Sequence, residues 1–177
     1  DLIEKFNLEH LGRSASMFDT DKLLALNSKH IQKKTPEELA GPLLFHLHTL
    51  GIDAKNDGFT QGVIQTLQPR SKTLVEMAQA AVFYYQDNLK FDEKAVKKFL
   101  KKDIAAVLEK SADYIEGLEK YTQEALETIF KKIMEETNLK FGKIAQPLRV
   151  AITGTTISPG IFEMLIALGK DKTVQRI

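Results

Sequence analysis

The chain has 177 residues, of which 43% are hydrophobic, and this length fills one sizeable core or two small cores in contact. Its formal net charge of +1 argues against a strongly basic nucleic-acid arm, and the absence of cysteine excludes disulfides and thiolate metal sites. No apolar run approaches the roughly 20 residues of a membrane helix, so we expect a soluble cytoplasmic protein without a membrane partner.

The first third of the chain carries two helix signals. Asp19 or Thr20 stands at a cap position, ahead of residues 23, 26, 30 and 31, whose spacing of 3, 4 and 7 predicts a helix with one apolar face. Residues 35–38 combine a hydroxyl cap, a proline at the first helical position and a glutamate able to reach back as a capping box. A second helix is therefore predicted from there to Gly51.

Further helices are predicted on both sides of an aperiodic segment. Residues 58–67 predict a short helix that ends before a proline, because the residue preceding a proline avoids the helical region. Ser71 or Thr73 opens the next helix, which runs through Tyr84. Residues 84–94 then break the periodicity, and we expect a boundary between two helical subdomains there.

Three capped or apolar-faced segments follow. Asp92 caps a lysine-rich helix, residues 104–118 carry an apolar helical face, and Thr122 caps a helix that extends to residue 133. Residues 90–103 hold six lysines against three acids, so a basic face is one possibility and an ordinary solvated helix surface is the alternative. The sequence leaves both open.

The last third is ambiguous by pattern. Residues 150–153 have strand propensity and precede a glycine, whereas Pro147 equally suits the first position of a helix that ends at that glycine. Downstream, Ser158 is predicted to cap a helix and Pro159 to be its first residue. The apolar face of this predicted helix consists of Ile161, Phe162, Leu165, Ile166 and Leu168.

Catalytic patterns are missing where they could be expected. Met164 stands where a phosphate-binding loop requires its first glycine, and Asp171 stands where it requires Ser or Thr. His46 and His48 are two residues apart, which on a helix points them about 200° away from each other, so they cannot share a metal. Ser158 has no histidine nearby in sequence. We therefore expect no catalytic residue, no metal site and no cofactor in this chain.

Three stretches together resemble one known family. They are residues 18–31 (FDTDKLLALNSKHI), residues 68–85 (QPRSKTLVEMAQAAVFYY) and residues 141–177, which begin FGKIAQPLRVAITG. In this order they look like the C-terminal half of the bacterial glutamyl-tRNA synthetases, which are class I aminoacyl-tRNA synthetases. The last stretch meets the family pattern G-K-x-x-x-P-L-R-x-A-x-T-G, whereas Ala25 departs from the tryptophan that many members carry.

The resemblance implies an all-α fold of two consecutive small helical subdomains that form an anticodon-binding cage. Residues 1–34 would connect it to an absent catalytic part, residues 35–85 would form the first subdomain and residues 86–177 the second. The parent protein would be a glutamate-tRNA ligase whose catalytic domain, with ATP and Mg, precedes residue 1, so this chain alone is expected to be inactive. The implied partners are the anticodon loop of tRNA(Glu) and the missing catalytic domain, and we expect a monomer.

The resemblance also assigns candidate anticodon-binding residues. Arg70 and Arg149 match family residues that contact anticodon bases, and the positions around those bases match Ser158, Pro159, Ile161 and Phe162. Thr153 is a further candidate because its hydroxyl can offer a hydrogen-bond donor to RNA. An arginine has only donors, so it pairs with O2 and N3 of cytosine, the last base of glutamate anticodons, and meets like donors on the guanine of glutamine anticodons. Arg70 is therefore the candidate selector, and it favours strict tRNA discrimination.

Two kinds of function remain after the sequence has been read. The first is an RNA-binding module of a glutamate-tRNA ligase, and the second is a helical interaction or scaffold domain without an RNA role. Salt dependence separates them, because phosphate contacts release counterions and RNA affinity then falls steeply with salt. For Thr153 and Ser158, a plain helix-capping role is as compatible with the sequence as a contact to RNA.

Overall fold

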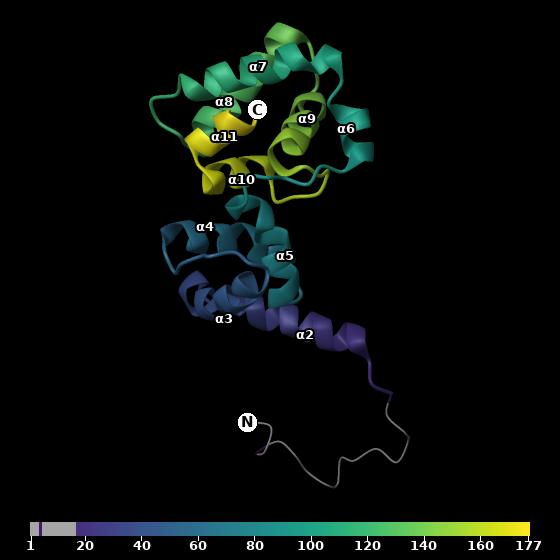
Figure 1. Ribbon diagram of the computed structural model, residues 1–177, viewed down its shortest axis with the longest axis vertical. Coiled ribbons are helices and arrows are strands. Elements are labelled where there is room, and N and C mark those ends of the chain that lie inside the picture. The colour runs from purple at the N-terminus through teal and green to yellow at the C-terminus, as the bar shows by residue number, and fades with distance from the viewer. Residues whose placement is uncertain (1–3, 5–16) are drawn as a thin grey trace.

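The computed structural model describes residue 4 and residues 17–177. All the regular secondary structure in residues 17–177 is helical (Figure 1). The all-α prediction is therefore confirmed for this part of the chain. Residues 1–3 and 5–16, which belong to the predicted connection at residues 1–34, lie outside the described residues. The helices are α2 (Thr20–Lys33), α3 (Pro36–Thr49), α4 (Gly58–Leu67), the 3₁₀ helix η2 (Gln68–Arg70), α5 (Leu74–Tyr85), α6 (Glu93–Phe99), α7 (Lys102–Glu116), α8 (Gln123–Thr137), α9 (Phe141–Thr153), α10 (Ile161–Leu168) and α11 (Lys170–Arg176).

The helices form an elongated molecule with α2 to α5 toward one end and α6 to α11 toward the other (Figure 1). The end of α5 and helix α10 lie where the two parts meet. Helix α10 packs against α4, and the fully buried Ile64 of α4 and Met164 of α10 belong to one apolar cluster. The hydrophobic core therefore runs through the junction. The division into subdomains at residues 85 and 86 stays a prediction.

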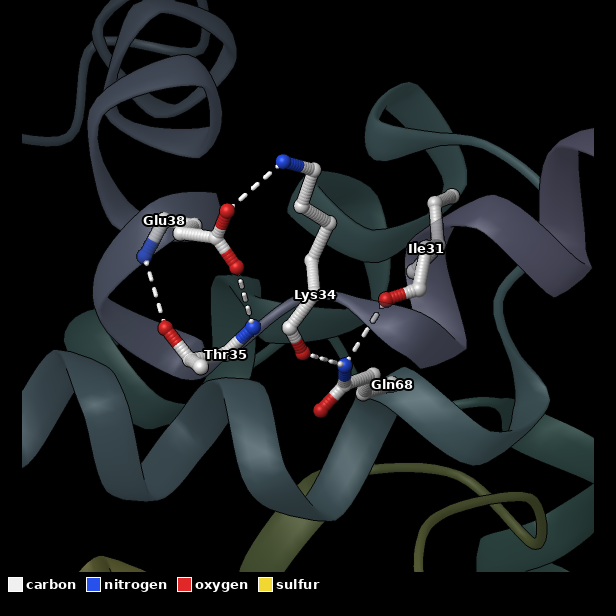
Figure 2. Close-up of polar contacts among 5 residues, drawn as sticks. All are labelled: Ile31, Lys34, Thr35, Glu38 and Gln68. Atoms are coloured by element: carbon white, nitrogen blue, oxygen red, sulfur yellow. Dashed lines mark hydrogen bonds and ion pairs between the residues drawn. The ribbon is translucent and has the colours of Figure 1, made fainter.

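The caps predicted for α2 and α3 are confirmed. The Asp19 carboxylate accepts hydrogen bonds from two backbone N–H groups of the first turn of α2, at 3.1 Å each. In α3, Thr35 Oγ1 accepts from the Glu38 N–H at 3.3 Å, and the Glu38 carboxylate accepts from the Thr35 N–H at 2.8 Å (Figure 2). The apolar face predicted for α2 is mostly exposed, however, since Leu23 and Leu26 keep 49% and 53% of their surface.

The Gln68 side chain joins η2 to the corner between α2 and α3 (Figure 2). The Gln68 amide donates to the carbonyl oxygens of Ile31 and Lys34, at 2.8 and 2.7 Å. These are carbonyls at the end of α2, where a helix leaves acceptors without internal partners. Gln32 of α2 adds a bond to the Pro69 carbonyl at 3.2 Å. The short helix that carries Arg70 is thus held by α2.

The end of α5 is held by side chains from α11, the last helix of the chain. The Arg176 guanidinium donates to the carbonyls of Phe83 (2.7 Å) and Gln86 (2.8 Å), and also to the carbonyl of Ile152 in α9 (3.2 Å). Lys172 donates to the Tyr84 carbonyl at 3.1 Å. Because the Arg176 side chain is only 7% exposed, these bonds form a buried link between α5, α9 and α11.

Of the two alternatives left open for residues 147–153, the structure has the helix and not the strand. Pro147 does not begin a helix, and residues 150–153 do not form a strand: both lie inside α9, which starts at Phe141 and ends, as predicted, before Gly154. Pro147 has no N–H, so it cannot donate the usual helical hydrogen bond to the carbonyl of Lys143. Lys143 is an exposed residue, where water is available to its carbonyl.

The predicted start of α10 is two residues too early. Its N-cap is Gly160, and neither Ser158 nor Pro159 belongs to the helix. The Ser158 hydroxyl makes no capping bond to α10; it accepts a bond from Arg149 and donates to the Pro159 carbonyl. Ile166, predicted on the apolar face, is 39% exposed, whereas its neighbour Leu165 is fully buried.

Candidate nucleic-acid interface

The loop between α9 and α10, residues 154–160, is the part of the structure on which the predicted site residues converge. It begins at Gly154, whose φ of 75° lies in the left-handed region that favours glycine. A Cβ atom at this position would lie 2.4 Å from the backbone oxygen of Lys90, and the Gly154 carbonyl accepts from the Asp92 N–H at 2.9 Å. The segment after α5 therefore runs directly against the start of the loop.

Arg149 reaches the loop from the last turns of α9. Its Nη1 donates to the Ser158 hydroxyl and, at 2.7 Å, to the Pro159 carbonyl. The side chain is half-buried, and its Nε is buried without a hydrogen-bond partner in the part of the chain that is described. Arg149 thus fixes the far end of the loop with part of its donors.

Arg70 reaches the same loop from η2. Its Nη1 donates to the Ser158 carbonyl at 3.0 Å, and the residue is otherwise exposed. The turn behind it is fixed, because the buried Ser71 hydroxyl donates to the Leu67 carbonyl at 2.9 Å, and Ser28 of α2 donates to the Ser71 carbonyl at 3.2 Å. Arg70 therefore projects from a held backbone and keeps several N–H donors available at the surface.

The two arginines create a local excess of positive charge. Burial lowers the pKa of Arg149, and the nearby Arg70 charge lowers it further. Neither guanidinium has a carboxylate in ion-pair range among the described residues. Because a charged group out of water is unfavourable unless it is paired, this arrangement is suited to a ligand that is rich in acceptors or negatively charged.

A groove of about 490 Å³ opens beside Arg70. One wall consists of residues between 79 and 90, from α5 and the segment after it, and the other consists of residues between 153 and 159. Of the predicted residues, Arg70, Thr153, Ser158 and Pro159 line this groove. The lining is mixed, with apolar surface for stacking and amide, hydroxyl and guanidinium groups for hydrogen bonds.

Thr153 has a structural explanation within the loop. Its hydroxyl donates to the Arg149 carbonyl at 2.9 Å and accepts from the Thr155 N–H at 3.2 Å. This local bonding closes the end of α9 and shapes the turn after it. The side chain is buried apart from the surface it presents to the groove, so its main effect is on the path of the loop.

Ile161 and Phe162 do not line the groove. Ile161 is 5% exposed and belongs to the core cluster. The Phe162 ring packs edge to face on Phe130, with centroids 5.0 Å apart, and lies 5.9 Å from the ring of Phe141. Both residues support α10 from the core side, and a direct contact with RNA bases stays a prediction for them.

Several residues that line the groove were not predicted from the sequence as site residues. Gln79 and Gln86 line the groove, as do Asn88 and Lys90 from the aperiodic segment after α5. Ile157 also lines it and is 86% exposed at the tip of the loop, which is unusual for so large an apolar side chain. The polar amides in the aperiodic segment were the available signal, but they marked only a boundary.

Among residues 17–177, no helix has both the length and the apolar character needed to cross a membrane. The same residues hold no group of three or more His, Cys, Asp or Glu side chains that could bind a metal ion. The groove is lined by Arg70, by polar side chains and by apolar side chains, of which Ile157 and Leu50 are exposed. These are groups that hydrogen-bond to and stack on unpaired nucleic-acid bases.

Curated relatives and solved structures are similar to this chain. A glutamate–tRNA ligase of Desulfosudis oleivorans is 50% identical, and one of Geotalea uraniireducens is 44% identical, each over all of this chain but only 38% of the relative. The chain therefore spans well under half the length of these relatives. Solved glutamate–tRNA ligase structures from Elizabethkingia meningosepticum and Elizabethkingia anophelis share its fold, with TM-scores of 0.87 and 0.82 at 21% identity, over 99% of this chain and 34% of theirs.

A family described as an anticodon binding domain matches residues 13–177, which is nearly the whole chain. The expected resemblance to glutamyl-tRNA synthetases is confirmed by these matches. The chain belongs to the family of anticodon-binding domains.

Proposed function

We propose that this chain is the anticodon-recognition part of a glutamate–tRNA ligase. It binds the anticodon loop of tRNA(Glu) and helps to select that tRNA for ATP-dependent glutamylation in protein synthesis. The observation that carries the proposal is the convergence of Arg70 and Arg149, without carboxylate partners among the described residues, on the loop at residues 154–160. The name shared by the relatives supports the same reading.

The chemistry of the groove fits a single-stranded loop better than a duplex. Unpaired bases present their Watson–Crick edges and their faces, and proteins read them with side-chain hydrogen bonds and with apolar or guanidinium stacking. Arg70 supplies donors for the O2 and N3 acceptors of cytosine, and the exposed Ile157 supplies an apolar surface for a base. Arg70 thereby favours strict selection of glutamate over glutamine anticodons.

The wider role of the parent protein belongs to the same proposal. It acts as a cytoplasmic, monomeric ligase whose catalytic domain lies outside this chain and uses ATP and Mg. This chain contributes recognition and no chemistry, in agreement with the catalytic patterns that its sequence lacks. Its partners are the tRNA and that catalytic domain.

The test is direct binding of the 177-residue chain to an RNA hairpin with a glutamate anticodon loop, compared with the same stem closed by an unrelated loop of equal length. We expect saturable binding that prefers the anticodon loop and weakens steeply with salt. Equal binding to both hairpins would mean that only backbone charge is recognised. No saturable binding to either would contradict the proposal and favour a helical scaffold without an RNA role.

A further inference from the structure

A row of lysines begins at the groove and continues along α6. Lys94, Lys97 and Lys98 are spaced by three and four residues, so they lie on one face of this helix, one turn apart. Lys90 precedes them and lines the groove itself. All four residues are exposed, and the opposite face of α6 buries Ala95. We call Lys90, Lys94, Lys97 and Lys98 the lysine row.

The segment of the lysine row has an excess of positive charge, with four lysines against Asp92 and Glu93. None of its four lysines makes an ion pair within the described part of the chain. Two acids accompany the row in sequence. Asp92 uses its carboxylate to cap α6, where it accepts from the N–H groups of Lys94 (2.8 Å) and Ala95 (3.3 Å), and Glu93 makes no ion pair with the row among the described residues. Like charges at helical spacings of three and four residues destabilise a helix. A row of this kind is unfavourable for the free protein and favourable toward a polyanion.

The lysine row is attached to the candidate interface by the backbone. The Asp92 N–H donates to the Gly154 carbonyl at 2.9 Å, and the Lys90 backbone oxygen lies so close to Gly154 that no Cβ would fit there. The row therefore starts at the groove wall and leads away from it along α6. A chain that places its bases in the groove would leave it beside this helix.

We propose that the lysine row binds the phosphate backbone of the RNA whose bases occupy the groove. The inference rests on the proposed function and adds a second, sequence-independent surface to it. In nucleic-acid complexes, phosphate contacts position the backbone while base contacts specify the sequence. Arg70 then reads a base, whereas the lysine row holds the flanking backbone and raises affinity for every RNA loop by the same factor.

The test compares two double variants of the 177-residue chain with the same loss of charge. In K94Q/K97Q, both replaced lysines lie in the row, have no side-chain ion pair among the described residues, and are changed to a residue of similar helix propensity. In the control K120Q/K131Q, both lysines are exposed and neither lines the groove. Each variant is titrated with the glutamate anticodon hairpin, and with the same hairpin ending its anticodon in guanine, between 0.05 and 0.3 M salt, a range chosen around the physiological value of about 0.15 M.

K94Q/K97Q is expected to lower the slope of log affinity against log salt by about 1.4, the value for two lost contacts to single-stranded phosphates. This corresponds to a loss of about 25-fold at 0.1 M salt relative to 1 M. The ratio of affinities for the cytosine and guanine hairpins should stay at its wild-type value. The control variant should keep most of the wild-type slope.

Four results would overturn the inference. If both variants lower the slope equally, the effect is general charge rather than the row. If K94Q/K97Q keeps the wild-type slope while the chain still distinguishes cytosine from guanine, the row has no backbone role and the proposed function stands. If K94Q/K97Q instead loses binding only to vesicles of anionic phospholipid, the row serves a membrane surface. Absence of any RNA binding by the wild type would remove the proposed function and this inference together.

Discussion

Arg70 is the side chain that we propose selects the base. One of its donors is used on the Ser158 carbonyl, at 3.0 Å, and the guanidinium otherwise faces the groove and solvent. The backbone that carries it is fixed by bonds from α2 to the Ser71 carbonyl and the Pro69 carbonyl. A donor-only group on a fixed support favours a base edge that offers acceptors.

Replacement of Arg70 by glutamine should relax this selection. Glutamine carries both a donor and an acceptor, so it can accommodate guanine as well as cytosine at the last anticodon position. We expect R70Q to remove most of a discrimination worth about 1 to 3 kcal/mol, the usual value of a good base contact. The measurement is the ratio of dissociation constants for the two hairpins.

The matched control for R70Q is K72Q, which removes an equal charge two residues away, from an exposed residue that does not line the groove. It should leave the ratio unchanged. If R70Q weakens both hairpins by the same factor, Arg70 supplies charge and does not select the base.

At the scale of elements, the loop between α9 and α10 depends on Gly154. Alanine there would have to adopt a φ of 75° and would place its Cβ 2.4 Å from the Lys90 oxygen, an atom of the backbone. We expect G154A to lower the free energy of unfolding by at least about 1 to 2 kcal/mol, the cost of the left-handed conformation alone. Urea denaturation measures this loss.

Gly41 offers the comparison, because it lies inside α3 and a Cβ there meets no atom within 4 Å. G41A should therefore stabilise the chain, by up to about 1 kcal/mol from helix propensity. If G154A were as stable as the unchanged protein, the close approach of the lysine-row segment to the loop would be wrong.

The link made by Arg176 sets the position of one groove wall. Its guanidinium bonds carbonyls of Phe83 and Gln86, which line the groove, and of Ile152 behind the loop. R176Q leaves acceptors without charged donors, so we expect a loss of about 2 to 3 kcal/mol in unfolding free energy. We also expect weaker binding of both hairpins with an unchanged ratio, because Arg176 positions the wall and touches no base.

The D87N variant distinguishes the contribution of these carbonyl bonds to stability from that of the ion pair between Arg176 and Asp87. The Asp87 carboxylate lies 3.7 Å from Arg176 but is 73% exposed, and exposed ion pairs contribute little to stability. D87N should therefore cost much less than R176Q. If D87N and R176Q lowered the free energy of unfolding equally, the contribution of Arg176 would come from the ion pair and not from the carbonyl bonds.

The elements that the sequence predicted well are those with local signals. The Asp19 cap and the Thr35 capping box act within four residues, and the structure has both. The start of α10 was misplaced because Ser158 has a partner in Arg149, a contact that depends on how α9 and the loop fold back. Pro147 was misplaced because prolines favour the first turn of a helix, whereas this one is buried inside α9.

The site was predicted unevenly for the same reason. The resemblance named both arginines, and the structure brings them to one loop from helices far apart in the sequence. It could not name Arg176, whose carbonyl partners in α5 lie about ninety residues earlier, because no local pattern marks such a contact. Ile161 and Phe162 were placed near the bases by position in a motif, whereas their packing in the core became visible only in three dimensions.

For the whole molecule, two helical parts share one core and form a groove between residues 79–90 and residues 153–159, which we propose binds an anticodon. The groove exists only when both parts are in place, since its walls come from both. Recognition should therefore be lost together with the folded state, and it should respond to the base identity that Arg70 faces.

The measurement that tests this most directly is the affinity of the unchanged 177-residue chain for a glutamate anticodon hairpin and for the same hairpin with its last anticodon base changed from cytosine to guanine. The account predicts tighter binding of the cytosine hairpin by about 1 to 3 kcal/mol, which is about 5- to 150-fold. Equal affinity for the two hairpins would contradict it, because the groove would then hold RNA without reading it.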